Sequence, residues 1–69
     1  MAHKLETRSA KELAERYNKS TLEKLRYHTQ ELVPLYKDTG DDGVENAEAN
    51  LVKYDEAINI LIEEINGGN

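Results

Sequence analysis

The chain contains no cysteine, tryptophan or phenylalanine, and it has a single proline. Without cysteine, neither a disulfide framework nor a thiolate metal site can form. No stretch approaches the ~18 apolar residues of a membrane span, and the first residues, Met1–Glu6, lack the apolar core of a signal peptide. We therefore expect a cytoplasmic protein, and nothing in the composition calls for a cofactor.

Large apolar side chains are also scarce. Leucine, isoleucine and valine together number fifteen among 69 residues. Sixty-nine residues leave room for one domain, residues 1–69. A core this small must use nearly every large apolar side chain, or the chain must bury apolar surface against a second chain.

The clearest pattern is a heptad repeat in the last third of the chain, which predicts one long helix over residues 43–66. Asp42, followed three residues later by Glu45, is a capping box that would begin this helix, and Gly67 and Gly68 would end it. Seven apolar positions lie on one seam of the helix: Val44, Ala47, Leu51, Tyr54, Ile58, Leu61 and Ile65.

A second heptad pattern predicts a helix over residues 20–37, beginning at a Ser20 capping box. Pro34 lies inside it and removes one backbone donor, so the helix either kinks there or stops near Leu32. We favour a kink because the pattern continues to Tyr36. The seam positions are Leu22, Leu25, Thr29, Leu32 and Tyr36.

The loop between these helices, residues 38–43, is short and rich in glycine and aspartate, which predicts an antiparallel helical hairpin. A third capping box at Ser9 predicts a short N-terminal helix over residues 9–18. The expected fold is thus all-α, with residues 1–8 and 67–69 frayed. The apolar positions of the short helix are Ala10, Leu13, Ala14 and Tyr17.

The apolar face of the long helix widens near its end, where Ile60 and Ile62 lie beside the seam. Either Leu13 and Tyr17 of the short helix cover them, or a second chain does. We expect a helical-bundle oligomer, most simply a homodimer, with an interface that contains four isoleucines: Ile58, Ile60, Ile62 and Ile65.

The sequence gives little support for a catalytic site or a metal site. Of the two histidines, His3 lies near the end of the chain that we expect to be frayed, and His28 has no obvious carboxylate to orient it. The loop acids fail the EF-hand calcium template, because Ala49 occupies the position of its bidentate glutamate. We therefore expect neither an enzyme nor a metal protein.

Charge is divided unevenly along the chain. Residues 1–40 carry eight basic against six acidic side chains, whereas residues 41–69 carry one against eight, for a net charge of −5. Oppositely biased halves are typical of pairing within or between chains. We expect a small non-catalytic interaction or regulatory protein that binds itself or a protein partner, of the size of phage or mobile-element accessory proteins.

A basic and tyrosine-bearing stretch from Arg16 to His28 supports an alternative function. The segment from Leu13 to Leu22 resembles the helix-turn-helix of repressors, although Leu22 comes about two residues early, and the resemblance implies a DNA-binding regulator. Tyrosine rings beside cations also suit a nucleotide, so an oligomer that sequesters nucleotides is the other form of this anion-binding hypothesis. Its candidate residues are Arg16, Tyr17, Lys19, Lys24, Arg26 and Tyr27.

Overall fold

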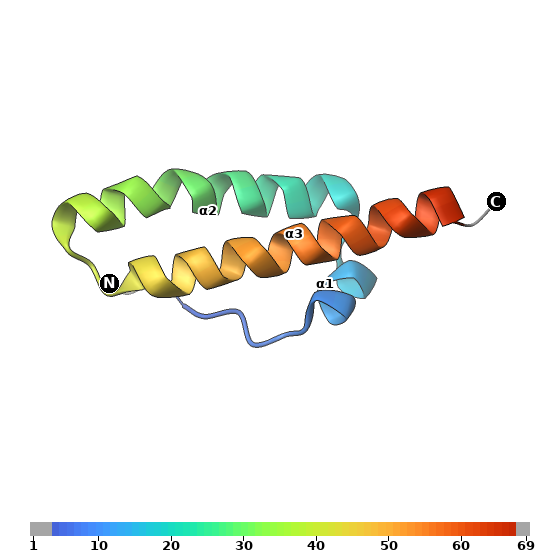
Figure 1. The fold of residues 1–69 in the computed structure, drawn as a ribbon, viewed down its shortest axis with the longest axis horizontal. Coiled ribbons are helices and arrows are strands. Elements are labelled where there is room, and N and C mark those ends of the chain that lie inside the picture. The colour runs from blue at the N-terminus through green and yellow to red at the C-terminus, as the bar shows by residue number, and fades with distance from the viewer. Residues whose placement is uncertain (1–3, 68–69) are drawn as a thin grey trace.

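A computed structural model describes residues 4–67, and within them the chain forms three helices and no strand. These are α1 (Ala10–Arg16), α2 (Lys19–Thr39) and α3 (Gly43–Gly67). Helices α2 and α3 form an antiparallel hairpin, and α1 folds back against α3 (Figure 1). The predicted all-α hairpin with a short N-terminal helix is confirmed, in an elongated molecule that measures 47 × 19 × 14 Å.

The helix ends follow capping chemistry, with corrections at the starts of α2 and α3. Ser9 caps α1 as predicted, because its hydroxyl accepts a hydrogen bond from the Glu12 N–H (3.1 Å). Helix α2 begins one residue earlier than predicted. Its cap is Asn18, whose side chain accepts from the Thr21 N–H (2.8 Å), so Ser20 lies within the first turn and the predicted Ser20 cap is wrong.

The turn between α2 and α3 uses Gly40 and Asp41. Gly40 ends α2 in the left-handed conformation, with φ of 69°, which costs least for a residue without a Cβ. At the start of α3, the Asp41 carboxylate accepts from the Gly43 N–H (2.7 Å). The side-chain contact at the start of α3 is therefore made by Asp41, whereas the sequence predicted Asp42. Gly67 is the last residue of α3, and Gly68 lies outside the described residues.

Helix α2 continues through Pro34 to Thr39, so it does not stop near Leu32. Pro34 is exposed, and so is Gln30, whose carbonyl loses its helical donor. Water can reach that carbonyl, and half-buried residues on both sides of the proline hold the helix against α3. Exposure of the interrupted hydrogen bond therefore explains why the helix tolerates proline.

Helix α3 is the central element, with α2 on one side and α1 on the other (Figure 1). The heptad seam predicted one buried face, but the structure buries a second one. Gly43, Asn50 and Ala57 recur every seven residues and are all buried. The core that joins the three helices contains Leu13, Ala14, Leu22, Tyr54, Ala57 and Ile58.

The segment before α1, residues 4–9, lies along α3 and is called the arm below (Figure 1). The Asn50 side chain accepts from the Glu6 N–H (2.8 Å) and donates to the Lys4 carbonyl (2.9 Å). Lys53 donates from Nζ to the Glu6 carbonyl (2.8 Å). Within the stretch predicted to be frayed, the main chains of Lys4 and Glu6 thus have hydrogen-bond partners on α3. Residues 1–3 and 68–69 lie outside the described residues.

Candidate interaction surfaces

The six candidate anion-binding residues do not form one cluster. Arg16 pairs with Glu12, one turn earlier in α1 (3.2 Å), and Lys19 pairs with Glu23, one turn later in α2 (3.4 Å). Arg26 forms an ion pair with Asp55 of α3. Three of the four cations thus face carboxylates of their own chain, which reduces the positive potential available to an anion.

The two tyrosines of this group differ in environment. Tyr17 follows the last residue of α1 and is half-buried against the core. Tyr27 is 65% exposed on α2, one helical turn from the exposed Lys24. A hydrogen bond to Glu31 and the negative charge of that carboxylate raise the pKa of Tyr27. Tyr27 and Lys24 therefore form an exposed surface with an acidic neighbour, separate from Tyr17.

The helix-turn-helix resemblance does not extend to the packing. That motif packs its two helices across a turn of three or four residues. Here Tyr17 and Asn18 alone separate α1 from α2, and α1 packs chiefly against α3. The short connection directs α1 toward the far side of α3.

The four isoleucines predicted at an oligomer interface lie in three environments. Ile58 is buried in the core of its own chain, and Ile60 and Ile62 are half-buried against that core. Leu13 belongs to that core and Tyr17 packs against it, so the short helix contributes to the core that Ile60 and Ile62 contact. Ile65 is 66% exposed.

A shallow cleft of about 500 Å³ lies where the last turns of α3 pass the start of α2. Leu61 and Ile65 supply its apolar side chains. Lys19 and Glu64 bring opposite charges to the same cleft. We call this the terminal cleft, and its lining residues are Asn18, Lys19, Ser20, Leu61, Glu64 and Ile65.

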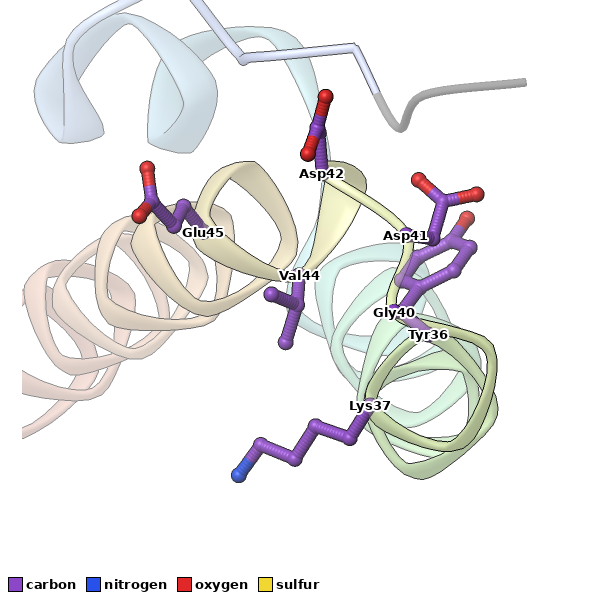
Figure 2. A pocket seen from close by; sticks show the side chains of 7 residues that line it. All are labelled: Tyr36, Lys37, Gly40, Asp41, Asp42, Val44 and Glu45. Carbon is purple, nitrogen blue, oxygen red and sulfur yellow. The ribbon is translucent and has the colours of Figure 1, made fainter.

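A second cleft, of about 440 Å³, lies beside the turn between α2 and α3 (Figure 2). Asp42 and Glu45 point to one side of it and Lys37 points to the other, while Asp41 lies beside Tyr36. The acidic side chains do not converge on a common point. Within residues 4–67, no group of three histidine, aspartate or glutamate side chains is placed to hold a metal ion.

Asn50 and Tyr54 are buried polar side chains on α3; the sequence placed Tyr54 on the seam but gave Asn50 no role. Asn50 is 2% exposed, and the arm satisfies both ends of its side-chain amide. Burial raises the pKa of Tyr54, and the Glu6 carboxylate raises it further, whereas a hydrogen bond with Thr29 acts in the opposite direction. The seven-residue spacing of Gly43, Asn50 and Ala57 is the sequence signal that could have revealed this second buried face.

In the part of the chain that the structure describes, no helix combines the length and apolar character needed to cross a membrane. Comparison of the sequence with protein-family models and with curated proteins, and of the fold with solved structures, gives no match in any of the three.

Proposed function

We propose that this chain is a small, non-catalytic interaction protein that associates with a second copy of itself through the terminal cleft. The observation that carries the proposal is Ile65, which is 66% exposed although neighbouring isoleucines of α3 are covered by their own chain. Together with Leu61 it leaves an apolar surface at the end of the hairpin. Covering such a surface is favourable by about 25 cal/mol per Å² of apolar area.

The charged side chains that line the terminal cleft favour a second copy of the chain as its occupant. A twofold contact brings the same patch of both copies together, so the patch must be complementary to itself. The terminal cleft has Glu64 and Lys19 on one patch, the latter paired with Glu23 of its own chain, and a twofold rotation can bring the Lys19 of one copy near the Glu64 of the other.

The test is the solution mass as a function of protein concentration. We expect the weight-average mass to rise above the 7.9 kDa of one chain toward twice that value. Ile65→Glu should return the mass to that of one chain, because it places a charge on the apolar surface. Val52→Glu is the matched control, since Val52 is 58% exposed on the same helix and outside the cleft.

Both substitutions replace exposed side chains, so both variants should keep the helical circular dichroism of the wild type. A wild-type mass equal to one chain at all concentrations would contradict the proposal. So would equal loss of association in the two variants, because the association would then depend on net charge rather than on the terminal cleft.

Anion binding is the second candidate function, and the exposed ring of Tyr27 one turn from Lys24 is the observation that favours it. A flat, exposed ring beside a cation suits a nucleotide base and its phosphate. We expect a nucleotide to raise the melting temperature of the wild type at low salt. Tyr27→Ala should abolish that shift, whereas exposed Leu35→Ala on the same helix should keep it. No shift with mononucleotides or DNA would exclude this function.

A further inference from the structure

The contacts between α3 and the arm are directed at the arm's main chain. The Asn50 side-chain amide binds the carbonyl of Lys4 and the N–H of Glu6. These groups are two residues apart, and in an extended chain such groups lie on the same edge. Lys53 adds a third bond, to the carbonyl of Glu6. Asn50 and Lys53 thus clamp one edge of an extended segment, and we call them the Asn50–Lys53 clamp.

The arm's side chains contribute much less to its position. Lys4 and Thr7 are exposed, and Leu5, its one large apolar residue, is 46% exposed. A cavity of about 380 Å³ is lined by arm residues together with Asn50 and Tyr54 of α3, so the arm is not packed closely onto the helix. Main-chain hydrogen bonds, rather than burial of apolar side chains, therefore hold the arm.

The side chain of Glu6 is the exception, being less exposed than its neighbours. Its carboxylate lies 3.6 Å from the guanidinium of Arg8, also in the arm. Arg8 in turn lies 3.5 Å from Glu12 of α1. Both ion pairs lie within the arm and α1, whereas the Glu6 carboxylate also acts on Tyr54 of α3, whose pKa it raises.

We propose that the Asn50–Lys53 clamp is a binding site for an extended peptide main chain, filled in cis by residues 4–6, whose partner in trans is the arm of a second copy. The fit between clamp and arm is already present within one chain, and every copy carries both parts. Exchange of an identical element between copies therefore needs no new surface. This proposal does not rest on the terminal cleft.

The test uses the full-length variant Glu6→Pro, which deletes the N–H that binds Asn50 and so weakens the arm's hold on the clamp, leaving the bonds to the Lys4 and Glu6 carbonyls. The probe is a capped peptide with the sequence of residues 4–9. We expect it to shift the side-chain amide resonances of Asn50 saturably at millimolar concentrations, because a free peptide must exceed the roughly millimolar effective concentration of the tethered arm to compete with it. A full-length Leu5→Pro chain is the control, since the Leu5 N–H lies outside the three clamp bonds and the arm should keep the peptide out.

Two modified peptides test whether the main chain is recognised. Methylation of the Glu6 nitrogen should weaken binding by roughly tenfold, the effect of one hydrogen bond to a buried acceptor. Methylation of the Leu5 nitrogen should leave binding within roughly twofold of the unmodified peptide, because no clamp bond uses that nitrogen.

A second measurement covers the case in which Glu6→Pro fails to fold. In the wild type, excess peptide should compete with the tethered arm and accelerate hydrogen exchange at the Glu6 amide. Absence of saturable binding and of accelerated exchange would overturn the proposal, and so would equal weakening by the two methylations. The terminal-cleft variant Ile65→Glu should bind the peptide normally in the exchange assay, which separates this proposal from self-association through the cleft.

Discussion

Replacing Asn50 with alanine should destabilise the protein by releasing the arm from α3. The side chain is 2% exposed and makes two hydrogen bonds to the arm. A hydrogen bond of this kind contributes about 1 kcal/mol net, so we expect a loss of about 2 kcal/mol in the free energy of unfolding. At about 0.05–0.15 kcal/mol per residue, the whole chain has only about 3–10 kcal/mol of stability.

Thermal denaturation followed by circular dichroism measures this effect. In a domain of this size, about 2 kcal/mol corresponds to a fall of about 8–16 °C in the melting temperature. Asn59→Ala is the matched control, because it makes the same change on an exposed position of α3. Alanine is the better helix former, so that variant should melt at the wild-type temperature or slightly above it.

A melting temperature of Asn50→Ala within about 3 °C of the wild type would refute the reasoning, since the clamp bonds would then contribute almost nothing. Equal destabilisation by Asn50→Ala and Asn59→Ala would refute it as well. The effect would then arise from asparagine in the helix and not from contact with the arm.

Three further predictions concern the core, the turn and the pH dependence. Leu13→Ala should lower the free energy of unfolding in urea titrations by about 2–5 kcal/mol, because Leu13 is fully buried. The control Leu35→Ala, at a position that is 59% exposed, should change this free energy by less than about 0.5 kcal/mol. Gly40→Ala should lower the free energy of unfolding by about 1–2 kcal/mol. The loss comes from backbone strain alone, because φ is 69° and an added Cβ would meet no atom within 4 Å. Gly67→Ala should be nearly neutral in the same assay. The pKa of Tyr54 is raised above its ordinary value of 10.0 in the fold. The stability that the neutral phenol contributes is therefore complete below about pH 9 and is lost as the pH rises through the folded-state pKa. Above about pH 9 the wild type should lose stability more steeply than Tyr54→Phe, and parallel curves would contradict this assignment.

The hairpin could be predicted because its signals are local and periodic. The seam that contains Leu22, Thr29, Tyr54 and Ile58 describes the contact between α2 and α3, and all four residues are buried. Gly40 ends α2 because few residues other than glycine adopt its positive φ readily. These features depend on the residues within one helix or one turn.

The arm and its clamp could not be predicted in the same way. Asn50 is polar and lies off the heptad seam, so the heptad pattern did not mark it as buried. Its burial depends on the arm, a segment more than forty residues away in the sequence. The arm itself has no periodic pattern from which an extended segment packed on a helix could be predicted. A small-residue stripe through Gly43 and Ala57 was the only local sign of a second buried face.

The candidate sites failed for a related reason, because sequence spacing does not reveal which charges meet across helices. Arg26 appeared available to an anion, but Asp55 lies opposite it on α3. Likewise, Ile58 appeared available to a second chain, but the core of its own chain buries it. Ile65 remains exposed because α3 continues past the start of α2, and that follows from the relative lengths of the packed helices.

Association of two copies through the terminal cleft is the central claim, and an isotope-filtered nuclear Overhauser experiment on a mixture of labelled and unlabelled chains tests it most directly. It detects contacts between copies without any substitution. We predict cross-peaks from the methyl groups of Leu61 and Ile65 to the other copy, and none from Val52. Absence of intermolecular cross-peaks, or cross-peaks from Val52 in place of Ile65, would contradict the account.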